Sequence, residues 1–136
     1  MRDSRTSNGK RALQVVVAFC SVVPLAAGAA GMILGPALIT NGAGDNRDLD
    51  GHFRYLSGLL FGIGLAYAFS VPRIERHRQR FLMLGGIVVL GGFGRLLSLL
   101  LRGTPSPVML GALVMELLVT PSLTLWQLRI SREQVT

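Results

Sequence analysis

The order of hydrophobic and polar positions divides the chain into four apolar segments with short polar segments between them. An α-helix needs about 20 apolar residues, with a range of about 17 to 25, to cross the hydrocarbon core of a bilayer. The shortest of the four segments is at the lower limit of this range, so an extra turn or a thinner bilayer is expected there. The predicted spans are residues 12–34, 55–71, 81–101 and 108–128.

The polar segments carry turn residues and charge, which is typical of the connections between membrane helices. They read "NGAGDNRDLDGH", "PRIERHRQR" and "RGTPSP", and residues 1–11 and 129–136 remain as tails. The sequence therefore predicts an all-α fold, a four-helix transmembrane bundle. Since the third connection is short, spans three and four form an antiparallel hairpin.

The distribution of Lys and Arg predicts the direction of the spans, because short cytoplasmic segments carry an excess of them. On one side lie Arg2, Arg5, Lys10, Arg11, Arg73, Arg76, Arg78, Arg80, Arg129 and Arg132. On the other side lie Arg47, Arg54 and Arg102. Both termini are therefore expected in the cytoplasm, and the connection with Asp45, Asp48 and Asp50 is expected to face outward.

Composition agrees with a bilayer environment. Charged residues make up 15% of the chain, below the average of about 25% in soluble domains, and 17 of the 136 residues are Gly. The net charge of +7 does not predict nucleic-acid binding, because the basic residues lie between the apolar runs without interleaved aromatics. A secretory signal peptide is the alternative for the N-terminus, but the apolar run continues past "AAGAAG" and a retained first helix is favoured.

Two charged residues interrupt the last two apolar segments. Arg95 lies in span three and Glu116 in span four. Counted from the turn between Thr104 and Pro105, their depths differ by only a few Å at ~1.5 Å rise per residue. An unpaired charge at the bilayer centre costs at least ~2.5–3.5 kcal/mol. We therefore expect an Arg95–Glu116 ion pair facing the bundle interior, in the outer half of the membrane.

Three further polar residues are expected near this pair. Ser98 shares the helix face of Arg95 and can donate to the pair. Arg54 and His52 lie at the outer start of span two, so they reach the same outer mouth if spans two and three are neighbours. One positive charge is then left over, which favours a polar or anionic guest such as a lipid headgroup. Two alternatives stay open: the pair only fixes helix register, and Arg54 snorkels to the interface.

Small residues are expected to bring helices into close contact. The positions predicted for helix packing are Gly58, Gly62, Gly91 and Gly92, and contact inside one bundle or in a homodimer remains open. Pro24 and Pro121 lie inside spans one and four and are expected to kink them. The basic segment "RIERHRQR" is read as a topology signal, with docking of anionic lipid headgroups as the alternative.

No catalytic residues, metal ligands or cofactor are expected. "NRDLDG" imitates the start of a calcium loop, but its first position is Asn46 and its twelfth is Ser57. His52 and His77 are expected on opposite sides of the membrane, and Cys20 is the single cysteine, so neither a shared histidine metal site nor a thiol pair can form. No nucleophile–base motif or phosphate-binding Gly loop is found.

The segments "HFRYLSGLLFGIGL", "IERH", "LGGFGRLLSLLLRGTPSP" and "MELLVTP" resemble bacterial membrane proteins grouped as domain of unknown function 4345. The resemblance covers residues 12–128, and it implies a four-helix membrane protein with no assigned activity. The matching positions are His52, Arg54, Gly58, Glu75, Gly92, Arg95, Ser98, Gly103, Pro105, Glu116 and Pro121.

The sequence thus predicts a multi-pass protein of the bacterial cytoplasmic (inner) membrane. The first hypothesis is binding of a lipid or a small polar or anionic molecule at His52, Arg54, Arg95, Ser98 and Glu116. The second is a non-catalytic helper subunit or assembly factor of another membrane complex. The third and weakest is an enzyme that acts on a lipophilic substrate.

Overall fold

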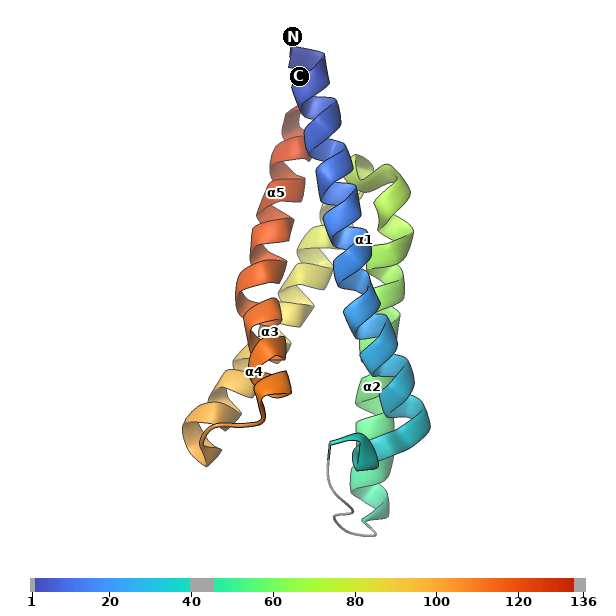
Figure 1. Ribbon diagram of the computed structural model, residues 1–136, viewed down its shortest axis with the longest axis vertical. Coiled ribbons are helices and arrows are strands. Elements are labelled where there is room, and N and C mark those ends of the chain that lie inside the picture. Colours follow the sequence, from blue (N-terminus) through green and yellow to red (C-terminus); the bar gives the residue numbers. More distant parts are fainter. Residues whose placement is uncertain (1, 40–45, 134–136) are drawn as a thin grey trace. The chain divides into compact units, whose positions relative to one another are not determined.

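The computed structural model describes residues 2–39 and 46–133 and is helical almost throughout (Figure 1). Asp45 of the predicted outward connection lies outside the described residues, as do residue 1 and residues 134–136 of the predicted tails. The elements are α1 (Arg2–Leu34), η1 (Gly35–Leu38), α2 (Arg47–Ser70), η2 (Val71–Arg76), α3 (Arg78–Arg102), α4 (Pro107–Val114), η3 (Met115–Val119) and α5 (Thr120–Glu133).

The all-α prediction with four membrane-spanning helices is confirmed. Within the described residues, four helical segments are long and apolar enough to cross a membrane: Ser7–Leu38, Arg47–Arg76, Arg78–Arg102 and Pro107–Arg132. The second is longer than the sequence predicted, because α2 begins at Arg47 and η2 follows it to Arg76. The path is kinked at Arg73, whose φ of −127° and ψ of 47° are not helical. Asn46 caps α2: its Oδ1 accepts from the backbone N–H groups of Asp48 and Leu49, both at 3.1 Å. The segment that imitates a calcium loop is therefore the start of a helix.

The chain divides into two compact units, of which one comprises Val15–Pro72. In this unit α1 and α2 pack closely where one of them has a glycine. A Cβ at Gly28 would lie 2.6 Å from the backbone N of Phe61, and a Cβ at Gly64 would lie 2.9 Å from Leu25 Cγ. Gly31 faces Ser57 with no room for a side chain. Backbone contact thus replaces side-chain bulk along this hairpin.

The other unit comprises Met1–Gln14 and Arg73–Thr136, and its main contact joins α3 to η3 and α5. Two glycines of α3, seven residues apart, set the close approach. A Cβ at Gly85 would lie 2.6 Å from Thr124 Oγ1, and a Cβ at Gly92 would lie 2.6 Å from Leu117 Cδ2. Gln127 of α5 is fully buried, and its Nε2 donates to the backbone O of Ile74 at 2.8 Å. This hydrogen bond joins η2 to α5.

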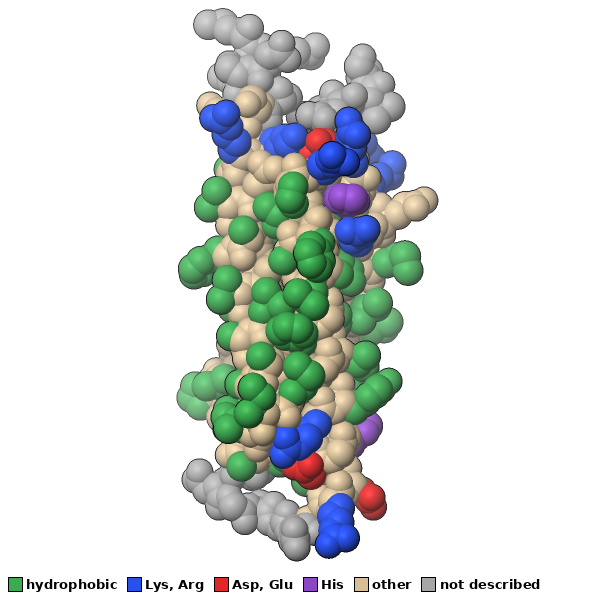
Figure 2. All heavy atoms as spheres, turned by 90° about the vertical axis from the view of Figure 1, so that its right-hand side faces the viewer, with side chains coloured by type: hydrophobic (Ala, Val, Ile, Leu, Met, Phe, Trp, Pro, Cys, Tyr) green, Lys and Arg blue, Asp and Glu red, His purple; other side chains and the backbone are tan. Residues whose placement is uncertain are grey.

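The distribution of side chains along the helices is the reverse of that in a water-soluble protein. Large hydrophobic side chains such as Phe19, Leu90 and Leu100 are at least 70% exposed, whereas Thr124 and Gln127 are buried. Figure 2 shows hydrophobic side chains along the middle of the visible helices and charged side chains near their ends. Buried hydroxyls bond to their own helix, as Thr124 Oγ1 does to Thr120 O at 2.9 Å. Apolar lipid is the surroundings in which this arrangement is stable.

Candidate binding site on α3 and η3

The predicted ion pair forms in the structure. Arg95 Nε of α3 donates to Glu116 Oε1 of η3 at 3.0 Å. The Glu116 side chain is 17% exposed and that of Arg95 is 39% exposed, so the carboxylate lies inside and the guanidinium lies toward the surface. The positive charge of Arg95 and the negative charge of Glu116 are thereby paired within one unit. Pairing avoids the cost of an unpaired charge in a membrane-spanning helix.

The turn that carries Glu116 is not α-helical. Residues Met115–Val119 form a π-helical turn, in which the backbone N–H of Thr120 donates to Met115 O. The Thr120 hydroxyl donates to the same carbonyl at 2.9 Å. Pro121 follows directly and has no N–H to offer the carbonyl of Leu117, so α-helical bonding cannot continue through this point. The interruption expected at Pro121 is therefore present as a π turn, whereas Pro24 lies within the continuous α1.

Gly92 brings the two helices close enough for the pair to form. It lies three residues before Arg95, on the same side of α3. A Cβ there would lie 2.6 Å from Leu117 Cδ2 and 3.0 Å from Glu116 Cβ. The packing role predicted for Gly92 is thus matched by the geometry. Gly91 differs, because a Cβ at that position would meet no atom within 4 Å.

The pair leaves hydrogen-bonding capacity unused. Glu116 Oε2 is buried and accepts no hydrogen bond from the described residues. Arg95 Nη1 lies 2.9 Å from Met109 Sδ, a weak acceptor, and Nη2 makes no hydrogen bond within the described chain. An orphaned acceptor therefore lies beside a donor that is only partly satisfied. The sequence did not point to Met109, because a methionine in an apolar helix carries no polar signal.

Ser98 does not join the pair as expected. It shares the helix face of Arg95, but it is exposed and forms no hydrogen bond with either Arg95 or Glu116 in the described structure. A serine at this depth faces outward from the unit. Met109 takes the place beside the guanidinium that was expected for Ser98.

Arg54 belongs to the other unit, where it closes the end of α1. Its guanidinium bonds Asp50 through both oxygens, with Nε–Oδ2 at 2.8 Å and Nη2–Oδ1 at 3.1 Å. Nη1 also donates to the carbonyls of Met32 at 2.6 Å and Ile33 at 3.0 Å, which are left open at the helix end. The expectation that Arg54 leaves one positive charge over is therefore wrong, because Asp50 neutralises it.

Gly35 makes the contact with Arg54 possible. Its φ is +63°, and a Cβ there would lie 2.6 Å from Asp50 Oδ1 and 2.7 Å from Arg54 Nη2. His52 is exposed on the first turns of α2. A common mouth for His52, Arg54 and the Arg95–Glu116 pair stays a prediction.

The other two glycines predicted for packing behave differently from each other. A Cβ at Gly58 would lie 3.4 Å from Met32 Sδ, which is an ordinary contact within the α1–α2 hairpin. A Cβ at Gly62 would meet no atom of its own unit within 4 Å. No group of three or more His, Cys, Asp and Glu side chains that could hold a metal ion lies within the described ranges.

Comparison with known proteins places the chain in one family. The family model described as domain of unknown function (DUF4345) matches residues 12–127. The match includes the Arg95–Glu116 pair, the π turn and the Arg54–Asp50 clamp. Neither the curated proteins nor the solved structures gave a match. Because the family model covers nearly the whole chain, this protein belongs to the DUF4345 family.

Proposed function

We propose that this protein is a multi-pass protein of the bacterial inner membrane that binds the polar group of a lipid or small amphiphile at Arg95 and Glu116. With both termini in the cytoplasm, the pair lies in the outer half of the membrane. Arg95 is seven residues from the end of α3 and Glu116 is nine residues after the start of α4. At ~1.5 Å per residue both are therefore about 10–14 Å below the outer helix ends.

The observation that carries the proposal is the buried, unpartnered Glu116 Oε2. A buried acceptor without a donor costs about 1–3 kcal/mol, and more if it is charged. A ligand hydroxyl that donates to Oε2 removes this cost. The same group can accept from Arg95, whose guanidinium has an unused N–H donor and is 39% exposed.

The charge balance narrows the chemistry of the ligand. Arg95 and Glu116 neutralise each other, and Arg54 is neutralised by Asp50. An anionic guest is therefore not favoured at the pair. A neutral group with a hydroxyl that both donates and accepts fits better, such as the glycerol or sugar portion of a lipid headgroup. Exposed Leu97 and Leu101 on α3 offer apolar contact to the remainder of an amphiphile.

Native mass spectrometry of protein released from its own membranes without delipidation tests the proposal. The wild type is expected to carry a stoichiometric small adduct, and Glu116→Gln is expected to lose it. The substitution keeps an acceptor for Arg95 but leaves an amide that cannot replace both carboxylate oxygens. Arg102→Gln on the same helix is the matched control and should keep the adduct. A bare wild-type protein, or an adduct that survives Glu116→Gln, would reject the proposal.

The helper-subunit alternative has one specific observation in its favour. Gly62 of α2 and Gly91 and Gly94 of α3 are exposed, and a Cβ at any of them would meet no atom of its own unit. Such positions allow another transmembrane helix to approach closely. Proximity labelling in the native membrane separates the two functions: a helper loses its labelled partner in Gly62→Leu and Gly91→Leu while the fold is retained. A binding protein keeps its adduct in both variants.

A further inference from the structure

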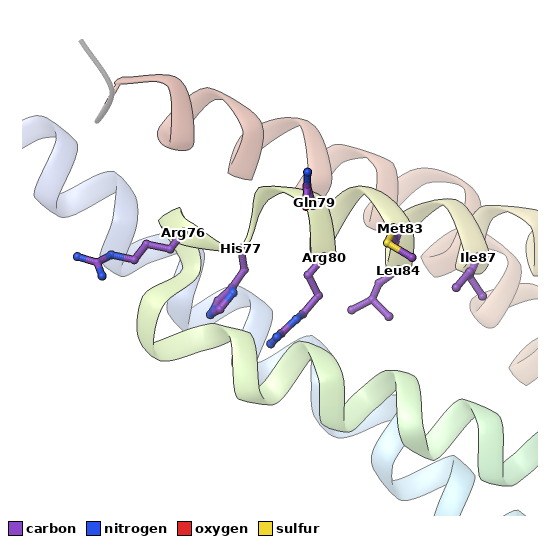
Figure 3. Close-up of a pocket in the computed structure, with 7 residues that line it drawn as sticks. All are labelled: Arg76, His77, Gln79, Arg80, Met83, Leu84 and Ile87. Carbon is purple, nitrogen blue, oxygen red and sulfur yellow. The ribbon is translucent and has the colours of Figure 1, made fainter.

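A cavity of about 480 Å³ lies along η2 and the start of α3, away from the Arg95–Glu116 pair and on the same unit. Its lining has two parts. Arg76, His77, Gln79 and Arg80 provide the polar part, and Met83, Leu84 and Ile87 continue it with apolar side chains. In Figure 3 the side chains of His77, Arg80 and Leu84 point to one side of the helix, and Gln79 points to the opposite side.

This end of the unit carries excess positive charge. The segment from residue 73 to residue 80 has four arginines and one acidic residue, Glu75. Glu75 is already paired, because Lys10 Nζ lies 2.9 Å from its Oε2. Arg76 forms no ion pair within the described residues and is exposed. Arg76 at the rim of the cavity is therefore not in an ion pair with Glu75, the acidic residue next to it in the chain.

The order of the lining residues matches an amphiphile that is anionic at one end. Cationic side chains occupy the end of α3 that lies outside its apolar run, and Leu84 and Ile87 follow one and two turns further into that run. A soluble anion would use the arginines but leave the apolar part without a partner. A nucleic acid would likewise leave the apolar side chains of the cavity without a partner. An acidic phospholipid satisfies both parts, with its phosphate at the arginines and its upper acyl chain along α3.

We propose that this cavity is a binding site for an acidic phospholipid in the leaflet that faces the termini. The site differs from the one proposed at Arg95 and Glu116 in position, charge and ligand. Its ligand is anionic, whereas the pair favours a neutral hydroxyl group. The basic segment therefore does more than orient the helices: it holds one lipid at a defined place.

The test measures retention of phosphatidylglycerol by the full-length protein in mixed phosphatidylcholine nanodiscs, followed by native mass spectrometry. Arg76→Gln/Arg80→Gln is expected to weaken retention of phosphatidylglycerol about 30-fold, since each basic residue near a lipid surface contributes about fivefold. Arg73→Gln/Arg78→Gln is the matched control, because it removes the same charge from the same segment but not from the cavity lining. It should change retention at most a few-fold.

Two more arms keep the proposal testable. Arg76→Lys/Arg80→Lys keeps the charge and should retain most of the binding, so that the loss in the glutamine variant is traced to the charge and not to the length of the side chain. Soluble glycerol phosphate, which lacks acyl chains, should not displace the lipid. Equal losses in both glutamine pairs would mean general attraction to an anionic surface, and displacement by glycerol phosphate would mean a free-anion site. Either result overturns the proposal.

Discussion

Glu116 shows how much one residue can reveal when its surroundings are apolar. A carboxylate in a membrane helix needs a partner, and the one basic residue at a similar depth in the neighbouring span is Arg95. The structure confirms the pair at 3.0 Å. What the sequence did not predict is the second carboxylate oxygen, which is buried and unpartnered. Together with the neutralisation of Arg54 by Asp50, that atom narrows the expected ligand from a polar or anionic molecule to a neutral group that carries a hydroxyl.

The pair itself is expected to show strong coupling. Arg95→Leu and Glu116→Gln should each lower thermal stability in detergent, because each leaves its partner without a counter-charge. The double variant should lose less than the sum of the two, with a coupling of about 0.5–3 kcal/mol. Melting curves of the two single variants and the double variant measure it. Additive losses would contradict direct contact.

Gly92 and Gly91 make a matched pair of residues. Gly92→Ala places a methyl group against Leu117 and Glu116 and should destabilise the protein by about 1–3 kcal/mol, as overpacking does. Gly91→Ala meets nothing within 4 Å and should be neutral or slightly stabilising, since alanine favours a helix over glycine. Thermal stability of both variants in the same detergent is the measurement. Equal losses would show that α3 and η3 are not in close contact at Gly92.

At the scale of the element, irregular turns place the polar groups. The π turn Met115–Val119 presents Glu116, and the tight turn at Gly35 presents the carbonyls that Arg54 binds. Both irregularities have a covalent cause in the sequence: Pro121 lacks a backbone N–H donor, and Gly35 has no Cβ and so adopts φ +63° without strain. The sequence showed both residues, but their consequences depend on which carbonyls and side chains lie opposite them.

Gly35→Ala tests the clamp at the end of α1. The left-handed backbone costs alanine about 1–2 kcal/mol, and the added Cβ would also lie 2.6 Å from Asp50 Oδ1. The thermal midpoint should therefore fall by several degrees. Gly51→Ala in the first turns of α2 is the control, because its Cβ meets no atom within 4 Å and should leave the midpoint unchanged or higher. An unchanged midpoint in Gly35→Ala would mean that the Arg54 clamp contributes no stability.

At the scale of the whole molecule, the charge distribution predicts how the chain is oriented. In a Cys20→Ser background, Thr104→Cys is expected to react with an impermeant maleimide added outside the inner membrane. Arg78→Cys should react only after the membrane is opened. Thr104 lies in the connection between α3 and α4 and Arg78 is the first residue of α3; both are exposed, so access decides the outcome. If Arg78→Cys reacts from outside and Thr104→Cys does not, the orientation is the opposite of the predicted one, and the Arg95–Glu116 pair lies in the cytoplasmic half of the membrane.

The sequence by itself determined the four helices and the Arg95–Glu116 pair. Both follow from local physics. In lipid, an apolar run can satisfy its backbone hydrogen bonds only as a helix. Opposite charges at equal depth on two helices joined by a short turn form an ion pair, because an unpaired charge in the membrane is costly. Family membership also followed from the order of motifs along the chain. The packing glycines could be predicted only in part. Gly91 and Gly92 are adjacent in the sequence but point to different sides of α3, and only the side of Gly92 faces η3.

Only the tertiary structure decided what each polar group contacts. In the structure Arg54 pairs with Asp50 and donates to carbonyls at the end of α1. Met109 lies beside Arg95, and Ser98 is exposed. It also anchored Gln127 on Ile74. These contacts depend on rotation about each helix axis and on a π turn that adds a residue to one helical turn. Hydropathy along the chain carries no information on that rotation, because nearly every neighbouring position is apolar.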